Sequence, residues 1–511
     1  MKNTFLIPQS AFYLLVISVS LIIFQMFTGL NYPVFRDEFY YIDCANHPAF
    51  GYVDHPPLSV FILYLWKSVF GTSQLSLRII PAMCQAATVY LSGVITSQMG
   101  GSKYAQVIAA LITMFVPNYL GTAGFYSMNA FDILIWAVMF VILLKILSDD
   151  NTRLFILLGA VAGIGLQNKI SAGFFIAAML PALLFTKQRK YFLSGYLYAG
   201  LALCGLIFLP YIVWNFQNDF ASLEFISNAS KYKISDITPL NFFTAQILEI
   251  NPLYFIFWFT GLIFLLFSKT LNKFQVAGLI YIFTFLILAL QNSKPYYLAA
   301  SYTPLIAAGS LLFADIIAVK KLDFVKKVLP ALIIIAGLII SPFAVPLLSP
   351  QKFIDYSQFL GITPQNAERN QLGALPQHFA DRFGWEELTD KVAKIYNSLP
   401  DNEKLITGIF AQNYGETGAI NYYGKKYNLP ECNSGHNNHW LWGPRHDSLE
   451  TFIIIGGGDE DDHLESFEEV VKMYVHTNQF AMLYENNLPV FLCRKIRKPI
   501  KEIWKETKMF I

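Results

Sequence analysis

Residues 11–30 read AFYLLVISVSLIIFQMFTGL and indicate the fold class, because no charged residue interrupts these twenty positions. A helix of about 20 apolar residues is long enough to cross the hydrocarbon core of a bilayer. The run is longer than the apolar part of a secretory signal peptide, and no cleavage motif of small residues follows it. We therefore expect an uncleaved signal anchor that begins a membrane protein.

The composition of the whole chain supports a membrane location. Of 511 residues, 55% are hydrophobic, 16% aromatic and only 14% charged, which excludes an ordinary soluble protein. The net charge of +2, without a basic tract, gives no reason to expect a nucleic-acid partner. The five cysteines are odd in number and scattered, so they indicate neither a disulfide framework nor a zinc motif. They leave open a single pairing of Cys432 with Cys493.

Apolar runs of about 20 residues recur through the first two thirds of the chain. They predict about eleven transmembrane helices. The runs lie at residues 11–30, 79–98, 104–120, 129–147, 153–168, 170–186, 192–214, 252–268, 274–291, 296–318 and 328–348.

Lysine and arginine residues occupy every second loop between these runs. They are Lys2, Lys103, Lys145, Arg153, Lys187, Arg189, Lys190, Lys269, Lys273, Lys320, Lys321, Lys326 and Lys327. Loops rich in these residues remain on the cytoplasmic side of a membrane. We therefore expect a multi-pass protein of the cytoplasmic membrane, with its N-terminus inside and the chain after residue 348 outside.

The composition changes after residue 348, where charged residues, asparagine and glycine return. Short apolar runs at residues 405–410, 451–455 and 490–493 predict strands. Residues 386–396 and 463–473 read as amphipathic helices. We therefore expect two domains, a transmembrane catalytic domain over residues 1–348 and an extracytoplasmic α/β domain over residues 349–511.

The first outer loop, residues 31–78, carries the most unusual stretch of the chain. Residues 35–58 read FRDEFYYIDCANHPAFGYVDHPPL and hold four carboxylates next to lipid, where an uncompensated charge is costly. Such a density favours a catalytic site over a solvated loop. The next apolar stretch, residues 58–70, is too short to span and predicts a re-entrant or interfacial helix.

Three residues of this stretch, Asp43, Asp54 and His55, have a structural interpretation as well. Asp54 and His55 stand where a cap of the helix after Pro56 would be, since Asp is a favoured helix-starting residue. Asp43 is expected to be a structural partner of Arg36 or Arg78.

Other ionisable residues fall on the same outer side of the predicted topology. They are Arg78, Asp132, Lys169 and Lys294. Cations at this level can bind a phosphate, and a carboxylate can accept a proton. Snorkelling of the lysines and anchoring by Arg78 are the structural alternatives.

The combination suits transfer of a sugar from a polyprenyl phosphate. The leaving phosphate is already a stabilised anion, so the reaction needs a base and cations but no general acid, and it inverts the anomeric carbon if base and phosphate lie on opposite sides. Asp37 is the expected base. His55, Arg78, Lys169 and Lys294 are the expected phosphate contacts.

Several motifs resemble glycosyltransferase family 39, which contains protein O-mannosyltransferases and the aminoarabinose transferases of lipid A. The motifs are Arg36-Asp37-Glu38, Gly51-Tyr-Val-Asp-His-Pro-Pro-Leu58, Leu77-Arg78, Ser127-Met-Asn-Ala-Phe-Asp132, Asn168-Lys169 and Ser293-Lys-Pro-Tyr-Tyr297. The resemblance covers roughly residues 10 to 345. It implies the GT-C fold, a polyprenyl- or dolichyl-phosphate donor and an extracytoplasmic active site.

The resemblance also implies catalytic roles for Asp37, Glu38 and Asp132. In the aminoarabinose branch a Lys near the lipid phosphate stands where this chain has His55. A neutral imidazole supplies a hydrogen bond there but no full charge. Asp54 and Tyr297, in the same motifs, are candidate contacts for the sugar or the acceptor.

The expected outer domain adds two loops dense in hydrogen-bonding groups and aromatic rings, at residues 413–416 and 435–443. Asn413 and Trp440 are their candidate contacts for the sugar or the acceptor. Packing of the loops is the structural alternative. No cofactor is certain, and a divalent metal ion at Asp54 is left open.

The expected activity is that of a membrane glycosyltransferase that uses a polyprenyl-phosphate sugar and an extracytoplasmic protein, lipid or cell-surface glycan as acceptor. The alternative is a transporter or flippase of a lipid-linked sugar. Transporters are usually built from internal repeats with sites at the bilayer midplane. The sequence shows no repeat, and its charges gather on one side, which favours the enzyme.

Overall fold

A computed structural model describes residues 10–511 except 234, 236, 363–367, 370 and 447. Lys2, which contributes to the predicted topology, lies outside these residues. The chain forms two compact units, each made of three segments. The first, here called the transmembrane unit, comprises Met1–Asn31, Leu75–Val213 and Ser235–Leu347. The second, here called the α/β unit, comprises Tyr32–Gln74, Trp214–Ile234 and Leu348–Ile511.

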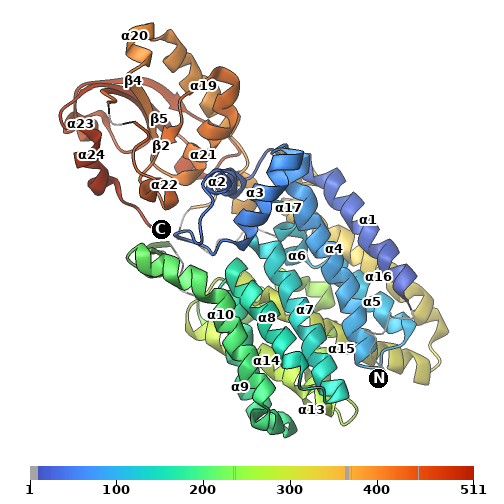
Figure 1. Ribbon diagram of the computed structural model, residues 1–511. Helices are drawn as coiled ribbons and strands as arrows, with labels where there is room; N and C mark the ends of the chain where they lie inside the picture. The colour runs from blue at the N-terminus through green and yellow to red at the C-terminus, as the bar shows by residue number, and fades with distance from the viewer. Residues whose placement is uncertain (1–9, 234, 236, 363–367, 370, 447) are drawn as a thin grey trace. The chain divides into compact units, whose positions relative to one another are not determined.

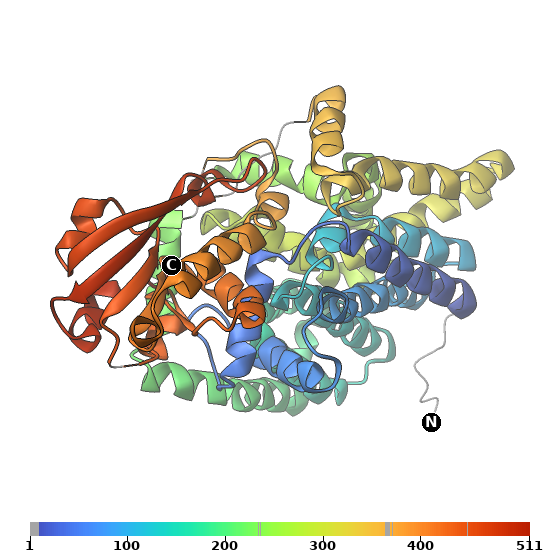
Figure 2. The same cartoon turned by 90° about the horizontal axis from the view of Figure 1, so that it is seen from above.

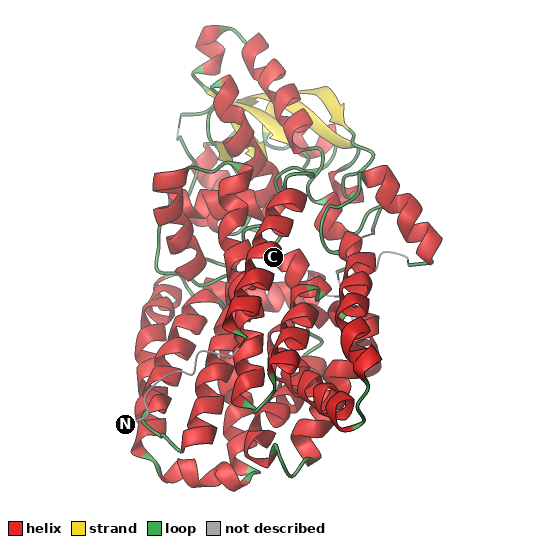
Figure 3. Cartoon of the chain, turned by 90° about the vertical axis from the view of Figure 1, so that its right-hand side faces the viewer, coloured by secondary structure: helices red, strands yellow, loops and turns green. Residues whose placement is uncertain are grey.

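The transmembrane unit is built from helices (Figures 1 and 3). They are α1 (Ala11–Gly29), α4 (Gln74–Gln98), α5 (Lys103–Met114), α6 (Pro117–Thr122), α7 (Met128–Asp149), α8 (Leu154–Asn168), α9 (Ser171–Leu184), η1 (Lys187–Leu193), α10 (Gly195–Gln217), α12 (Pro239–Ile250), η3 (Pro252–Tyr254), α13 (Phe255–Phe267), η4 (Asn272–Phe274), α14 (Gln275–Leu290), η5 (Pro295–Ser301), α15 (Thr303–Val319), α16 (Asp323–Ile340) and η6 (Ser341–Phe343).

Length and composition identify the helices that can cross a membrane. Among the described residues, six are long and apolar enough, or up to nine if each of three bent pairs counts as one span. The bends, of 110°, 96° and 59°, fall between α9 and η1, between α12 and α13, and between η5 and α15. Three further apolar helices among the described residues are shorter, namely Leu58–Phe70, α5 and α8. Each of the eleven expected runs overlaps one of these helices or pairs, so the expected polytopic helical fold is confirmed.

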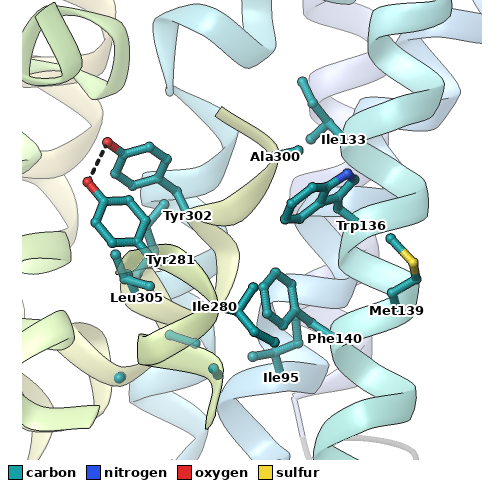
Figure 4. Packing of buried hydrophobic residues seen from close by; sticks show 14 of the residues in the cluster. Ile95, Ile133, Trp136, Met139, Phe140, Ile280, Tyr281, Ala300, Tyr302 and Leu305 are labelled. Atoms are coloured by element: carbon teal, nitrogen blue, oxygen red, sulfur yellow. Dashed lines mark hydrogen bonds between the residues drawn. The ribbon is translucent and has the colours of Figure 1, made fainter. Parts of the chain in front are cut away.

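Aromatic side chains fill the centre of the transmembrane unit (Figure 4). The indole of Trp136 on α7 meets the ring of Phe175 on α9 edge to face, with centroids 5.2 Å apart. The hydroxyls of Tyr281 and Tyr302 lie 3.0 Å apart, so both polar tips are hydrogen-bonded inside an apolar core. Helix association inside a bilayer depends on such packing and hydrogen bonding, because lipid tails are as apolar as the side chains.

The α/β unit contains a five-stranded sheet, which Figure 2 shows from above. The strand order is β2-β1-β3-β5-β4, with parallel pairs from β2 to β3 and antiparallel pairs beyond. The strands are β1 (Thr407–Ala411), β2 (Cys432–Asn433), β3 (Thr451–Ile455), β4 (Phe467–His476) and β5 (Leu488–Ile496).

Helices complete the α/β unit and cover both faces of its sheet. They are α2 (Arg36–Asn46), α3 (Leu58–Phe70), α11 (Ala221–Asn228), η2 (Ala229–Lys233), α17 (Pro350–Leu360), α18 (Gln377–Ala380), α19 (Trp385–Ser398), α20 (Asp401–Lys404), α21 (Tyr414–Tyr423), η7 (Gly424–Tyr427), α22 (Asn438–Leu441), α23 (Glu460–Leu464), η8 (Leu483–Glu485), α24 (Ile500–Ile503) and η9 (Trp504–Thr507). Leu388 and Val392 of α19 share a core with Ile453 of β3, whereas Ile500 and Trp504 lie in a second core with Phe452.

Most of the expected elements of this unit are present. The strands expected at residues 405–410, 451–455 and 490–493 are confirmed as β1, β3 and β5, and the helix expected at residues 386–396 is α19. The helix expected at residues 58–70 is α3. Pro57 is the N-cap residue of α3, so Asp54 does not cap it.

The helix expected at residues 463–473 is wrong, because the chain there forms the edge strand β4. Only the two ends of β4 are buried, so the alternation that marks a strand is missing from its sequence. Pairing with β5 decides its conformation.

Cys432 and Cys493 do not pair, and all five cysteines are free. Cys432 lies on β2 and Cys493 on β5, so β1 and β3 separate them in the sheet.

Candidate active site

Helix α2 places the acidic residues of the first loop. Its N-cap residue, Phe35, is extended, and the backbone N–H of Phe35 donates to Glu38 Oε2 at 2.8 Å. The Glu38 side chain is fully buried. A carboxylate in the first turn also interacts favourably with the positive end of the helix dipole. Glu38 therefore stabilises the start of α2, and its expected catalytic role stays a prediction.

Two glycines let α2 lie directly against α21. A Cβ atom at Gly415 would lie 2.7 Å from Arg36 Cγ, and one at Gly418 would lie 2.6 Å from Phe39 Cβ. Atoms of a side chain do not approach that closely. The spacing of three residues puts both glycines on one face of α21. This close contact brings the side chains at the start of α2 against those of the α/β domain.

Asp37, the expected base, receives a hydrogen bond from this domain. Tyr414 Oη donates to Asp37 Oδ1 at 2.9 Å. Asp37 Oδ2 receives no hydrogen bond from the residues that the structure describes. Burial raises the pKa of the Asp37 carboxyl above its ordinary value, while Arg36 and the Tyr414 hydrogen bond oppose that rise. The result is a half-buried carboxylate with one oxygen held and one available.

Arg36 supplies the positive charge beside Asp37. Its Cζ lies 4.5 Å from the centre of the Tyr414 ring, and its Nη1 donates to Tyr484 Oη at 2.6 Å. Tyr484 Oη in turn donates to Asp381 Oδ1 at 3.0 Å. Burial, partly offset by Arg36, raises the pKa of Asp381 to about 7. Sequence analysis did not identify Tyr414, Tyr484 or Asp381 as neighbours of Asp37.

Asp43 is structural, as expected, but its partner is not Arg36. His439 Nε2 lies 3.0 Å from Asp43 Oδ2, and Asn421 Nδ2 donates to the same oxygen at 2.8 Å. Arg36 pairs with Tyr484 instead. The expectation was wrong because both partners of Asp43 come from chain segments almost 400 residues later.

Asp54 and His55 lie together, close to α2. Tyr40 Oη donates to Asp54 Oδ1 at 2.9 Å, and His55 Nε2 lies 3.9 Å from the same oxygen. The His55 ring stacks on Tyr41 with centroids 4.8 Å apart. His55 Nδ1 faces the carbonyl of Pro56 at 3.0 Å, which places the proton of a neutral ring on Nδ1. Nε2 then donates to a phosphate only when the imidazole is doubly protonated.

The two expected contacts from the outer loops are held by neighbours. Asn413 caps α21, and its side chain accepts from the backbone N–H groups of Gly415 and Glu416 while donating to Glu416 and Glu485. Trp440 Nε1 donates to the carbonyl of Trp504 at 2.9 Å. Both residues have structural roles, and their contacts with a sugar stay predictions.

A second polar cluster lies in the transmembrane unit. Lys169 Nζ donates to Asn129 Oδ1 at 2.8 Å and lies 3.7 Å from Asp132 Oδ2. Ser171 donates to the other oxygen of Asp132. Lys169 Nζ also lies 4.7 Å from the centre of the Tyr297 ring. Three residues predicted separately, Asp132, Lys169 and Tyr297, are therefore in one cluster.

The other two predicted cations of this unit occupy different places. Arg78 is buried on α4, where a Cβ atom on Gly29 of α1 would lie 3.2 Å from its Cδ. Lys294 is half-buried and precedes η5, the segment that carries Tyr297. Their contact with a phosphate stays a prediction.

Metal binding at Asp54 receives no support from the geometry. Within the described part of the chain, no three His, Cys, Asp or Glu side chains group closely enough to hold a metal ion.

Comparison with known proteins places the fold. A family model described as dolichyl-phosphate-mannose-protein mannosyltransferase matches residues 54–214. The solved structure of ArnT from Cupriavidus metallidurans bound to undecaprenyl phosphate is similar with a TM-score of 0.58 and 13% identity, covering 93% of this chain and 97% of that chain. The same protein in the apo state gives 0.59 at 13% identity over the same shares. No curated protein sequence matches the chain.

A more distant enzyme is also similar. The oligosaccharyltransferase of Archaeoglobus fulgidus, tethered with an acceptor peptide, gives a TM-score of 0.52 at 14% identity, covering 88% of this chain and 69% of that chain. The chain therefore has the GT-C fold of a multi-pass membrane protein with a C-terminal α/β domain. The resemblance to family 39 glycosyltransferases is confirmed at the level of this fold and of the matched residues.

Proposed function

We propose that this protein is a membrane glycosyltransferase that moves a sugar from a polyprenyl phosphate to an acceptor outside the cytoplasmic membrane. One observation carries the proposal. In a chain with the GT-C fold, the Asp37 carboxylate has one oxygen held by Tyr414 and the other without a hydrogen bond from the described residues. The match to a dolichyl-phosphate-mannose transferase model and the undecaprenyl phosphate bound to the similar ArnT structure support the donor class.

The reaction is an inverting displacement at the anomeric carbon. The acceptor hydroxyl gives its proton to Asp37 while its oxygen forms a bond to that carbon. The bond from the carbon to the phosphate oxygen breaks, and its electron pair leaves with the polyprenyl phosphate. Water then takes the proton from Asp37. The leaving group is a stabilised anion, so a base and positive charge are sufficient.

The cations have the task of binding the donor phosphate. Lys169 is the first candidate, because Asp132 and Asn129 orient its ammonium group and a lysine carries a full charge. Arg78 and Lys294 are the further candidates in the transmembrane unit. His55 contributes when it is doubly protonated, through Nε2.

The remaining predicted residues are assigned to the sugar and the acceptor. Glu38 is proposed to support Asp37 in acceptor binding, and Asp132 to act through Lys169. Asp54, Tyr297, Asn413 and Trp440 are the proposed sugar or acceptor contacts. These side chains combine carboxylate or amide oxygens with aromatic rings, and that combination suits the hydroxyls and apolar faces of a sugar.

The proposal includes an orientation and a division of the chain. Residues 1–348 form the transmembrane catalytic domain and residues 349–511 the outer domain, with the N-terminus in the cytoplasm. The alternating lysine-rich loops support this orientation.

The test measures release of undecaprenyl phosphate from membranes that contain the protein. The probe is undecaprenyl phosphate carrying one radiolabelled sugar, with mannose, glucose, galactose and aminoarabinose tried in turn. We expect wild-type membranes to consume one of these donors and to release undecaprenyl phosphate. Asp37→Asn should lower the rate by about 10²- to 10⁴-fold, because the amide cannot accept the proton. Equal amounts of both proteins in the membrane serve as the control, and retained transfer by the variant would remove Asp37 as the base.

A transporter or flippase of a lipid-linked sugar is the second candidate, because it too would need charges beside lipid. It would move the labelled donor across vesicle membranes without releasing undecaprenyl phosphate. The same assay therefore separates the two functions.

A further inference from the structure

The contact between Asp37 and Tyr414 joins the proposed base to a domain with no assigned role. The two residues are 377 positions apart in the sequence. A carboxylate that acts as a base must present one lone pair to the acceptor hydroxyl. The Tyr414 hydroxyl holds Oδ1, which restricts rotation of the carboxylate and leaves Oδ2 as the basic oxygen.

Tyr414 is itself held on several sides. Its backbone N–H donates to His436 Nδ1 at 3.2 Å, and Asn413 caps the helix that it begins. One face of its ring meets the Arg36 guanidinium at 4.5 Å, and the Tyr40 ring lies 4.9 Å away. The side chain is buried. The hydroxyl therefore has a fixed direction toward Asp37 and is not an incidental contact of a surface loop.

The charges around Asp37 make this hydrogen bond important. Burial raises its pKa, and the negative charge of Asp54 acts in the same direction. Arg36, the Tyr414 hydrogen bond and Lys233 oppose the rise, in that order of size. A base must be ionised before it can accept a proton. Loss of the hydroxyl therefore leaves a smaller fraction of Asp37 ionised at neutral pH.

We propose that Tyr414 is a positioning residue for the catalytic base, so that the α/β domain takes part directly in catalysis. The hydroxyl of Tyr414 fixes Oδ1 of Asp37 and directs Oδ2 to the acceptor hydroxyl. Arg36 keeps the tyrosine ring in place. The inference rests on the proposed glycosyl transfer. It adds Tyr414 as a residue that positions the base Asp37.

The experiment compares Tyr414→Phe with the wild type in membranes, using the labelled undecaprenyl-phosphate sugar that the wild type consumes. A hydrogen bond to a charged group has a free energy that corresponds to about a 10-fold change in rate. We expect kcat to fall by about that factor, with the KM for the donor within about twofold of wild type. The acidic limb of the kcat/KM profile should move to higher pH, because loss of the Tyr414 hydrogen bond raises the pKa of Asp37.

Tyr427→Phe is the matched control. It removes another tyrosine hydroxyl of the same domain that donates to a carboxylate, Asp390 Oδ1, at 3.2 Å. Its rate and pH profile should equal those of wild type. If the role of Tyr414 is merely structural, Tyr414→Phe lowers the amount of folded protein but does not move the acidic limb of the kcat/KM profile. That result would overturn the inference.

The outcomes separate this inference from the proposed function. If wild-type membranes release no undecaprenyl phosphate from any donor, the proposed function fails. If wild type is active and Asp37→Asn is not, but Tyr414→Phe keeps the wild-type kcat and pH profile, only the inference fails. If Tyr414→Phe does not fold, Arg36→Lys replaces it. Arg36→Lys keeps the positive charge but loses the planar guanidinium group over the Tyr414 ring. The acidic limb of the kcat/KM profile should therefore move in the same direction as in Tyr414→Phe. An unchanged limb would contradict the inference.

Discussion

His439 Nε2 lies 3.0 Å from Asp43 Oδ2, with both side chains buried, and this pair joins α22 of the α/β domain to α2. Asp43 stands in the last turn of α2, six residues after Asp37. The pair therefore ties the helix that carries the proposed base to the domain that holds it.

Removal of one partner should destabilise the protein. His439→Ala leaves a buried carboxylate with Asn421 alone, and loss of a hydrogen bond to a buried charged group costs about 1–3 kcal/mol. The temperature at which half of the detergent-solubilised protein aggregates should fall. The side chain of His439→Gln still donates one hydrogen bond, so the aggregation temperature of this variant should fall less. Equal temperatures for both variants and wild type would show that the pair does not stabilise the protein.

Lys169→Ala should weaken binding of the donor. The substitution removes the ammonium group that Asn129 and Asp132 orient, and loss of one contact to a charged phosphate lowers affinity by about 10- to 100-fold. The KM for the labelled donor should rise by that factor. Lys169→Arg keeps the charge, so its KM should rise less. Lys145→Ala, which removes the ion pair with Asp149 at the other end of α7, is the control and should leave KM unchanged. An unchanged KM in Lys169→Ala would contradict the phosphate role.

Gly418→Ala should disturb the position of α2. The new Cβ atom would lie 2.6 Å from Phe39 Cβ and 3.1 Å from the carbonyl carbon of that residue, so the helix must shift. Such overpacking costs about 1–3 kcal/mol. We expect lower transfer activity together with a lower aggregation temperature. Gly373→Ala adds the same group 3.8 Å from its nearest neighbours and should leave both measurements at the wild-type values.

Asp381→Asn should change how stability depends on pH. Burial raises the pKa of Asp381 to about 7, so the folded state holds its proton between about pH 4 and 7 while the unfolded state does not. Stability of the wild type therefore falls as pH rises through this range. The asparagine variant lacks this loss, so its stability relative to wild type should be greater at pH 8 than at pH 5, by about 2–3 kcal/mol.

Asp390→Asn is the control for this comparison. Lys394 holds the pKa of Asp390 below its ordinary value, so ionisation of this carboxyl does not destabilise the folded protein as pH rises. Thermal inactivation of the detergent-solubilised proteins at the two pH values measures the difference. The same pH dependence in wild type and Asp381→Asn would show that Asp381 is ionised throughout.

The sequence predicts the transmembrane part well, because each span is a local signal of about 20 apolar residues. Apolar runs alone do not show the bends between α12 and α13 and between η5 and α15, although Pro252 and Pro304 stand beside these breaks. In the α/β domain β3 is buried throughout, and its four apolar residues 452–455 predict a strand. The edge strand β4 is mostly exposed, so its sequence resembles an amphipathic helix, and only its pairing with β5 decides the outcome.

The acidic residues of the candidate site could be predicted from their density beside lipid. Their partners could not. Tyr414 begins α21, in a stretch that the sequence predicts as a polar loop, and nothing local connects it with Asp37. His439 lies in the stretch 435–443, and nothing local in the sequence connects it with its partner Asp43. A single sequence carries no direct information about contacts between such distant segments.

The α/β unit is made of three segments of the chain, so the ribosome synthesises its parts at different times. Asp37 leaves the ribosome 377 residues before the tyrosine that holds it. At about 5–20 residues per second, the first loop waits roughly 20–75 s for its partner. During this interval α2 lacks the face of α21 against which it packs, and the proposed base has no fixed direction. If Asp37 acts as the proposed base, we expect a nascent chain that has inserted its first helices to be inactive until the last domain has been translated and has folded around α2.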